Sequence, residues 1–281
     1  MDDSWSARDV ADVIRTPVAG DDKYSRGVLG VRTGSVAYPG AAVLGVEAAW
    51  RTGLGMVRYL GTAREAVLAR RPETVAADGR VQAWLIGSGT DAASRSADET
   101  TALRGILSGD LPVAVDAGAL DLAPEARAPL VVTPHDREHD RLRAAMGLGA
   151  VQGDRAEAAV ETARTLGNVV LLKGSVTIVA DPGGRVILVD AATPWLATAG
   201  TGDVLGGVLG ALLAAAQAGA DLAPLAASAA WLHGRAGSLA AAAHAPARSL
   251  AAPRSGLAGG PITALDVAEA LPRAVAEVIA G

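Results

Sequence analysis

The stretch that decides the fold is LATAGTGD at residues 196–203, which runs directly into the apolar segment VLGGVL at residues 204–209. A loop rich in Gly and Thr therefore precedes a segment that predicts a helix too apolar to be exposed. Gly200 and Gly202 leave backbone N–H groups uncovered at the start of that helix, where the helix dipole also favours negative charge. With the hydroxyl of Thr201 as a further donor, the stretch predicts a cradle for a phosphate group.

Asp203 lies in the first turn of the predicted helix, beside this cradle. A carboxylate there could accept a proton from an alcohol that attacks phosphorus, as the catalytic Asp of kinases does. The helix dipole is expected to keep Asp203 ionised at neutral pH. The structural alternative is that Asp203 only caps the helix and that the glycines only form a tight turn. Four residues alone do not decide between these two interpretations.

Upstream of the loop, short apolar runs alternate with helical patterns. Strands are predicted at residues 28–31, 56–60, 81–86, 112–116, 129–132, 169–172, 176–180 and 186–189. Helices are predicted between them at residues 39–52, 63–71, 94–107, 136–146 and 154–166, the last with Asp154 as its N-cap. This alternation predicts an α/β fold in which crossover helices join parallel strands. The turn DPGG at residues 181–184 predicts that the last two strands form an antiparallel hairpin.

Downstream of the loop the pattern becomes helical throughout. Helices are predicted at residues 204–218, 224–243 and 263–279, and Thr263 with Asp266 comes close to a capping box. Residues 245–260 are expected to form a mobile loop. The chain shows neither internal repeats nor a break in composition. We therefore expect residues 1–281 to form a single domain.

Composition excludes several classes of protein. Of the 281 residues 50% are hydrophobic and 20% charged, which is sufficient for a core and excludes disorder. The net charge of −5 argues against non-specific nucleic-acid binding, and the absence of cysteine excludes disulfides, Fe–S clusters and a thiolate nucleophile.

The longest uncharged apolar stretch, at residues 204–220, is shorter than the roughly 20 residues of a membrane span. The N-terminus also lacks a signal-peptide pattern, so we expect a soluble, cytoplasmic protein without a membrane or nucleic-acid partner.

Residues 196–209 resemble the anion-hole motif of ribokinase-like enzymes. More narrowly, they resemble that of the ADP-dependent NAD(P)H-hydrate dehydratases, which are related to the C-terminal half of bifunctional NAD(P)H-hydrate repair enzymes. Further segments follow in the order of that family: GSVAYPGAA at 34–42 with AWRTGLGMV at 49–57, VDAGAL at 115–120, VTPHDRE at 132–138 and LKGSVT at 172–177. The resemblance covers about residues 23–243, and ordered segments are more specific together than any one motif.

The resemblance implies a ribokinase-like three-layer sandwich with a mostly parallel central sheet and a β-hairpin before the anion-hole loop. It implies a hydro-lyase that uses ADP, with Mg²⁺ as cofactor, to dehydrate the (6S)-hydrate of NADH or NADPH and releases AMP and phosphate. It also implies a homo-oligomer, since related enzymes form tetramers.

The resemblance assigns roles to individual residues. Asp203 is the expected catalytic base and also contacts the hydrated dinucleotide, together with Ala41, Gly89 and His135. The expected nucleotide-binding residues are Lys173, Gly174, Ser175, Val176, Thr177 and Gly202, and the expected anion hole is formed by Gly200, Thr201 and Gly202. Taken alone, Lys173 would be an ordinary residue at a strand end and Ala41 an ordinary residue at a helix start.

Three alternatives remain open at this stage. The same fold supports small-alcohol kinases, such as those for hydroxyethylthiazole or hydroxymethylpyrimidine. Gly118 and Trp195, which replace an Asp and a Gly of the family's pattern, favour a nucleotide-binding protein with weakened or lost catalysis. The pattern H-x-x-E-H at residues 135–139 is that of a zinc hydrolase with Glu138 as general base. Because the family pattern already accounts for Thr133 to Glu138, we expect no metal ligands here. We expect His233 and His244 to be packed or surface residues.

Overall fold

The computed structural model describes residues 4–151, 153–190, 193–245 and 259–281. In this part of the chain eight strands form one sheet in the order β2-β1-β3-β4-β5-β6-β7-β8. The pairs from β2 to β6 are parallel, whereas β7 pairs antiparallel with both β6 and β8, as the hairpin prediction requires. The strands are β1 (Val28–Arg32), β2 (Met56–Tyr59), β3 (Ala83–Ile86), β4 (Val113–Val115), β5 (Leu130–Val132), β6 (Val169–Leu172), β7 (Val176–Ala180) and β8 (Val186–Asp190).

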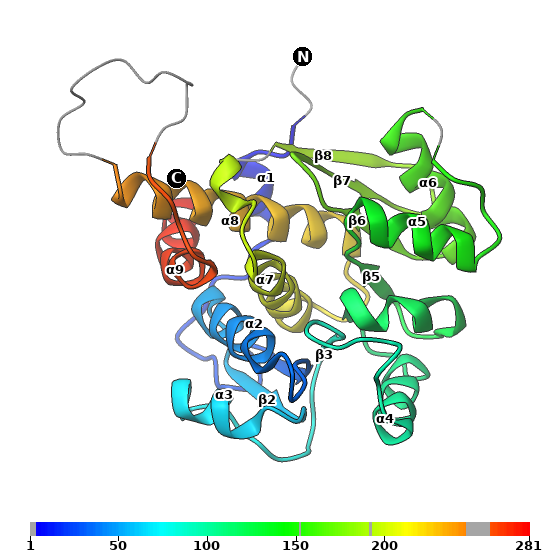
Figure 1. Ribbon diagram of the computed structural model, residues 1–281. Coiled ribbons are helices and arrows are strands. Elements are labelled where there is room, and N and C mark those ends of the chain that lie inside the picture. The colour runs from blue at the N-terminus through cyan, green and yellow to red at the C-terminus, as the bar shows by residue number, and fades with distance from the viewer. Residues whose placement is uncertain (1–3, 152, 191–192, 246–258) are drawn as a thin grey trace.

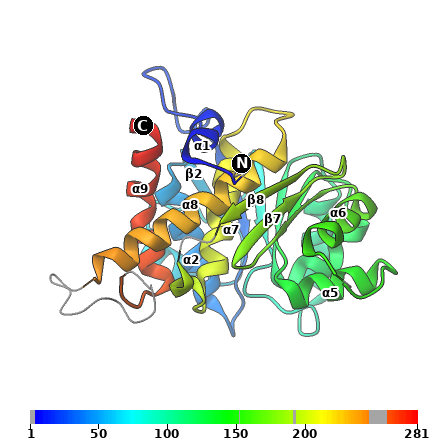
Figure 2. The same cartoon turned by 90° about the horizontal axis from the view of Figure 1, so that it is seen from above.

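Helices cover both faces of this sheet, which gives the predicted three layers (Figures 1 and 2). One face carries α1 (Ala7–Val13), α2 (Pro39–Thr52), α3 (Arg64–Arg70), α7 (Thr201–Ala215), α8 (Leu222–Ala243) and α9 (Ala264–Ala280). The other carries α4 (Ala97–Leu107), the 3₁₀ helix η1 (Ala117–Glu125), α5 (Asp136–Ala145) and α6 (Arg155–Leu166). A short 3₁₀ helix, η2 (Pro194–Leu196), precedes the glycine-rich loop.

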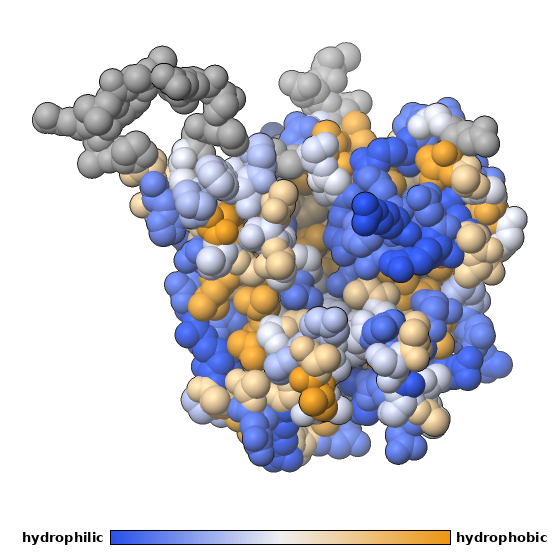
Figure 3. Space-filling model, in the orientation of Figure 1, coloured by the Kyte–Doolittle hydropathy of each residue, from blue (hydrophilic) through white to orange (hydrophobic). Residues whose placement is uncertain are grey.

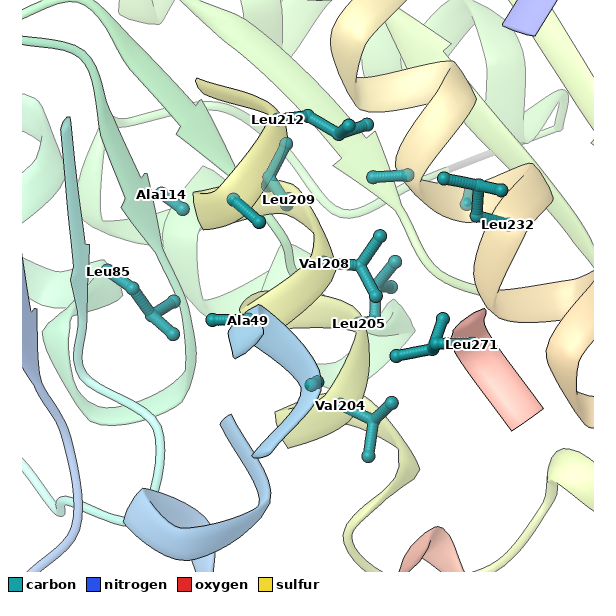
Figure 4. Close-up of a cluster of buried hydrophobic side chains, with 14 of the residues drawn as sticks. Ala49, Leu85, Ala114, Val204, Leu205, Val208, Leu209, Leu212, Leu232 and Leu271 are labelled. Carbon is teal, nitrogen blue, oxygen red and sulfur yellow. The ribbon is translucent and has the colours of Figure 1, made fainter. Parts of the chain in front are cut away.

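The central strands are apolar on both faces because each face is covered. Leu85 of β3 and Ala114 of β4 pack toward α2 and α7, as Figure 4 shows. Their chain neighbours Ile86 and Val115 pack into the second core, among α4, η1 and α5. Successive strand residues point to opposite faces, so a doubly covered parallel strand has to be a continuous apolar run. This explains why uninterrupted apolar runs predicted the strands.

Helix α7 is buried on nearly all sides, as its composition predicted. It lies between the sheet and the helices α2, α8 and α9 (Figure 4). A Cβ atom on Gly207 would lie 2.2 Å from the carbonyl oxygen of Gly45 in α2, so the two helix backbones are in direct contact. This contact fixes the first turn of α7 relative to the first turn of α2. In the described part of the chain, no helix is long and apolar enough to cross a membrane.

Several details differ from the sequence-based expectation. The sequence analysis missed α1, η1 and η2; α1 begins with a capping box in which Ser6 and Asp9 bond each other's backbone N–H groups. Helix α7 ends at Ala215 instead of residue 218, and α8 begins at Leu222, with Asp221 as its N-cap. The capping box at Thr263 is confirmed. Most of the loop predicted at residues 245–260 lies outside the described residues. The single domain stays a prediction.

Candidate active site

The candidate site lies at the carboxyl ends of four adjacent parallel strands. Ser88, Asp116, Thr133 and Lys173 follow β3, β4, β5 and β6 within two residues of each strand's end. Ligands of open α/β sheets bind at this edge, because the loops that leave the parallel strands converge there. Helices α2 and α7 begin beside these residues, so two helix N-termini face the same region.

The glycine-rich loop ends at Gly200, the N-cap of α7. Gly200 has a φ of 88°, and a Cβ atom there would lie 2.7 Å from Cδ1 of Leu44, so glycine is required on both counts. No side chain caps α7. The N–H groups of Gly200, Thr201, Gly202 and Asp203 therefore have no acceptor within the helix. The first three of these residues are those that the sequence analysis expected to form an anion hole.

The hydroxyl of Thr201 requires a correction to the predicted cradle. It donates within the loop, to the carbonyl oxygens of Leu196 and Thr198, both at 2.9 Å. The sequence analysis expected this hydroxyl to meet a phosphate group. The structure instead uses it to close the loop, and only the backbone N–H of Thr201 remains for an anion.

Asp203 lies in the first turn of α7, and its surroundings shift its pKa. Burial raises the pKa of Asp203 to about 6; the negative charge of Asp116 adds to the rise, and the positive charge of Lys173 opposes it. The helix dipole was expected to keep Asp203 ionised at neutral pH, and burial acts against ionisation. Asp203 is still mostly ionised at pH 7. A pKa closer to 7 makes it a stronger base than an ordinary Asp carboxylate.

Asp116 is the centre of a buried polar cluster. Its Oδ1 accepts hydrogen bonds from Nζ of Lys173 and Oγ1 of Thr133, both at 2.8 Å, and its Oδ2 accepts one from Oγ of Ser88 at 3.0 Å. Burial would raise the pKa of Asp116, but the Lys173 charge and the three hydrogen bonds outweigh it and hold the pKa low. Nζ of Lys173 also lies 3.6 Å from Oε2 of Glu138. Asp116 and Lys173 therefore form a hydrogen-bonded ion pair.

A pocket of about 880 Å³ opens beside this cluster. Six of the expected nucleotide-site and anion-hole residues line it: Lys173, Gly174, Ser175, Thr177, Thr201 and Gly202. Val176 lies outside this lining, and its carbonyl oxygen accepts a hydrogen bond from Nη1 of Arg155. The hydrophilic residues of α5, whose N-terminal residues form part of the wall, are gathered on the face shown in Figure 3. The size and polar wall of the pocket suit a nucleotide.

The expected substrate residues fall into two places. Gly89 lies against the start of α2: its φ is 67°, and a Cβ atom there would lie 2.4 Å from Cβ of Ala41. His135 instead lines the 880 Å³ pocket with Lys173. The structure thus brings Ala41 and Gly89 together and groups His135 with the expected nucleotide residues.

The histidines of the H-x-x-E-H pattern are engaged in separate interactions. His135 is the N-cap of α5, where its Nδ1 accepts a hydrogen bond from the backbone N–H of Glu138. His139 is buried, its Nε2 is 2.8 Å from Oγ1 of Thr162, and burial lowers its pKa to about 4. Across the described residues, no three His, Cys, Asp or Glu side chains gather as metal ligands. The zinc hypothesis gains no support from this geometry.

Sequence reasoning missed three residues of the site. Asp116 was quoted within VDAGAL at residues 115–120 without a role, and Ser88 was not named. Their positions at the end of one predicted strand and two residues after another were an available signal. His233, expected to be a packed or surface residue, lines the pocket from α8. Burial lowers the pKa of His233 to about 4, so the imidazole is neutral at pH 7. Its place in an Ala-rich helix gave no signal of this position.

Gly118 and Trp195, which depart from the family's pattern, do not obstruct the pocket. A Cβ atom on Gly118 would lie 2.2 Å from the carbonyl oxygen of Thr90, so this backbone arrangement admits only glycine there. Trp195 packs against the main core, while its neighbours Pro194 and Leu196 line the pocket. The pocket is therefore formed with both replacements present.

Magnesium fits this site only as a partner of a bound nucleotide. Mg²⁺ is usually held by one or two carboxylates together with substrate phosphates and water. Asp136 and Asp190 are the carboxylates that the pocket wall offers. When bound, the ion would neutralise phosphate charge, and the protein residues described above would act around it.

The mostly parallel sheet, with a nucleotide-sized pocket at its carboxyl edge and a glycine-rich helix start, has a ribokinase-like fold. Comparison with known proteins narrows this class. The model of the family described as NAD(P)H-hydrate dehydratase matches residues 29–254, and the chain belongs to this family.

Named relatives agree with this assignment. The chain is 50% identical over 227 residues to the bifunctional NAD(P)H-hydrate repair enzyme of Mycobacterium tuberculosis, a match that covers 75% of this chain and 46% of the relative. It therefore spans about half the length of this bifunctional protein. It is 36% identical over 236 residues to the ADP-dependent (S)-NAD(P)H-hydrate dehydratase of Neisseria meningitidis, covering 76% and 77% of the two chains.

Among solved structures, the chain is similar to the ADP/ATP-dependent NAD(P)H-hydrate dehydratase of Bacillus subtilis, co-crystallised with ATP and Mg²⁺. The TM-score is 0.81 at 26% identity, and the match covers 98% of each chain. The predicted fold and family are confirmed.

Proposed function

We propose that this protein catalyses the ADP-dependent dehydration of the (6S)-hydrate of NADH or NADPH, and that it releases AMP and phosphate. The observation that carries the proposal is the position of Asp203. Its carboxylate, with a pKa of about 6, lies in the first turn of α7, beside the backbone N–H cradle. Next to the cradle is a pocket large enough for a nucleotide. The name of the Neisseria meningitidis relative supports ADP as the phosphoryl donor.

The proposed reaction has two steps. The 6-hydroxyl of the hydrate attacks the β-phosphorus of ADP, Asp203 accepts the hydroxyl proton, and AMP leaves. The phosphate ester then loses phosphate from C6 and a proton from C5, which restores the reduced nicotinamide ring. Backbone N–H groups at Gly200, Thr201 and Gly202 stabilise the charge on the transferred phosphoryl group.

The pocket wall binds the nucleotide in this proposal. Lys173 contributes a positive charge, and the segment from Gly174 to Thr177 contributes backbone and hydroxyl groups. Val176 belongs to this segment, although the residue lies outside the pocket lining. His135 has a place in the same wall, so we propose that it contacts the part of the hydrated dinucleotide nearest to ADP.

Ala41 and Gly89 form the substrate side of the site. The absence of a side chain at Gly89 lets its loop lie against Ala41 at the start of α2. Such a backbone surface allows the hydrated nicotinamide ring to approach closely. Asp203 then lies between the two ligands and contacts the reacting hydroxyl.

Three finer assignments belong to the same proposal. We propose Mg²⁺ as the ion that accompanies ADP, because the pocket wall offers carboxylates but no complete protein cage. We also propose a homo-oligomer, with a tetramer as the form to test by sedimentation. A cytoplasmic location agrees with substrates that are nucleotides.

Phosphorus-31 NMR distinguishes the dehydratase from its alternatives. A dehydratase converts hydrated NADH and ADP to AMP and inorganic phosphate in equal amounts. A small-alcohol kinase would instead leave a stable phosphate ester of hydroxyethylthiazole or hydroxymethylpyrimidine. A binding protein without catalysis would bind ADP and release neither product.

A further inference from the structure

Asp116 joins the two sides of the site. Its carboxylate accepts from Lys173, which belongs to the nucleotide wall, and from Ser88, which precedes the substrate-side residue Gly89. These contacts connect the ends of β3, β4 and β6. The hydrogen bond from Thr133 to Asp116 connects the end of β5 as well. Asp116 is only 5% exposed, so its charge acts within the protein and is little screened by water.

The first turns of α7 lie between the same two partners. A Cβ atom on Gly202 would lie 3.8 Å from Nζ of Lys173, and one on Gly206 would lie 3.6 Å from Oγ of Ser88. Asp203 is therefore on a helical segment that approaches Lys173 at one end and Ser88 one turn later. Both partners are held by one carboxylate.

The geometry points to Asp116 as a positioning residue: as a buried carboxylate anion, it fixes the Lys173 ammonium and the Ser88 hydroxyl at two points along the helix that carries Asp203. This inference rests on the proposed role of Asp203 as a base, and it adds a residue to which no role was assigned. Asp116 acts through its neighbours and touches neither reacting atom.

Charges around Asp203 agree with this role. Burial is the main cause of the raised pKa of Asp203, and the Asp116 charge comes next, whereas Lys173 acts in the opposite direction. The charges of Glu138 in α5 and Asp203 in α7 also act on Lys173, and the Lys173 charge acts on His233 of α8. His135, which forms a β-bridge with Lys173, and Arg155, which donates to its carbonyl oxygen, are further titratable neighbours. The imidazole of His233 is neutral at pH 7. Asp116 is thus the anion that makes Asp203 more basic, and it also raises the pKa of Lys173 against the effect of burial.

A purely structural ion pair is the competing explanation. Loss of such a pair would lower the free energy of unfolding without changing how Asp203 titrates in the folded protein. The two explanations therefore differ in the titration of neighbouring groups, which NMR measures without any substrate. The chain has just two lysines, Lys23 and Lys173, so their side-chain signals are easily separated.

The test compares the parent protein with Asp116→Asn by carbon-13 NMR of Asp carboxyls and Lys Cε atoms. The Asp203 signal is the one missing from the Asp203→Asn spectrum. In Asp116→Asn we expect both Asp203 and Lys173 to titrate at lower pH than in the parent, while Lys23 in the same sample does not change. The matched control Asp110→Asn, at an exposed residue before β4, should leave all three unchanged.

Unchanged titration of Asp203 and Lys173 in folded Asp116→Asn would overturn the inference. If this variant does not fold, the carbon-13 titration of the parent protein tests the inference by itself. In the parent, Asp116 must stay ionised at the pH where Asp203 is half protonated. Protonation of Asp116 at or above that pH would equally refute it. Neither result depends on turnover, so a failure of the proposed dehydratase activity would be recognised separately.

Discussion

Gly207 in α7 packs directly on Gly45 in α2, so that a Cβ atom on Gly207 would lie 2.2 Å from the Gly45 carbonyl oxygen. The two helices begin at the carboxyl edge of the sheet, where α7 carries Asp203 and α2 carries Ala41. Their contact therefore sets the separation between the proposed base and the proposed substrate surface. A backbone contact this close leaves no room for any side chain.

We expect Gly207→Ala to lower the free energy of unfolding by about 1–3 kcal/mol and to reduce turnover sharply. The added methyl group can be accommodated only if α7 moves away from α2, which displaces Asp203. Chemical denaturation and a turnover assay measure the two effects. The control is Gly105→Ala in the exposed part of α4, where no heavy atom lies within 4 Å of the new Cβ. The free energy of unfolding of Gly105→Ala should exceed that of the parent by about 0.5–1 kcal/mol. Equal changes in stability and turnover for the two variants would refute the packing argument.

Asp203→Asn should reduce the rate by about 10²–10⁴-fold, because the amide cannot accept the hydroxyl proton. Its free energy of unfolding at pH 7 should equal or exceed that of the parent. The reason is that burial raises the pKa of Asp203, so the ionised form is costly in the folded state. Steady-state kinetics and denaturation measure both quantities. A fully active variant would refute Asp203 as the base, and a clearly destabilised one would mean that the ionised carboxylate stabilises the fold.

The pH dependence of the parent follows from the same group. Because Asp203 must be ionised to act as a base, kcat/KM should fall below pH 6, by about tenfold for each pH unit. An ordinary Asp would lose activity only near pH 4. A rate that stays constant between pH 7 and pH 5, in protein shown to remain folded, would be inconsistent with Asp203 as the base.

Lys173→Ala should weaken ADP binding, measured by calorimetry, because it removes the positive charge from the nucleotide wall. Lys23→Ala serves as the control, since Lys23 is exposed and lies over the Tyr24 ring, outside the pocket lining. Equal ADP affinities for Lys173→Ala and the parent would mean that the pocket does not bind the nucleotide phosphates.

His139 should make the fold sensitive to acid. Its folded-state pKa of about 4 is below the unfolded value near 6.5, so the unfolded chain binds more protons between these pH values. The His139 contribution to stability is therefore complete above pH 6.5 and is lost as the pH falls toward 4. In His139→Gln the free energy of unfolding should decline less steeply over this range than in the parent. Identical slopes would exclude His139 as the cause.

Zinc should not be required for activity, although residues 135–139 match a zinc pattern. His139 is hydrogen-bonded to Thr162 in the protein interior, away from the pocket. Protein that has been extensively chelated and then supplied with Mg²⁺ alone should retain full turnover. Stoichiometric zinc after purification, with activity proportional to it, would restore the hydrolase hypothesis.

The sequence predicted the parts of the fold that local pattern determines. Alternating apolar runs and helical segments identified the eight strands, and the DPGG turn identified the antiparallel hairpin of β7 and β8. Helix α1 escaped notice even though Ser6 and Asp9 form a capping box, because seven residues are too few for a clear helical period. The local signal at its start was present and could have been used.

The site was predictable only where one segment supplies its chemistry. The proposed N–H cradle at the start of α7 depends on residues next to one another, and a helix does begin at this loop, with Gly200 as its N-cap. The cluster around Asp116 depends on Lys173, 57 residues further along the chain, so no local pattern reveals it. The same holds for the rise in the pKa of Asp203, which results from burial by distant segments. The Thr201 hydroxyl was misassigned because its partners depend on how the loop closes.

The central claim is that Asp203 and the neighbouring pocket restore a damaged nicotinamide cofactor at the expense of ADP. The most direct measurement follows the near-ultraviolet absorbance of reduced nicotinamide when the protein is mixed with purified hydrated NADH, ADP and Mg²⁺. We expect the absorbance to recover with ADP, to remain flat without ADP, and to recover at most about a hundredth as fast with Asp203→Asn. No recovery with the folded parent protein, or equal recovery with Asp203→Asn, would contradict the account.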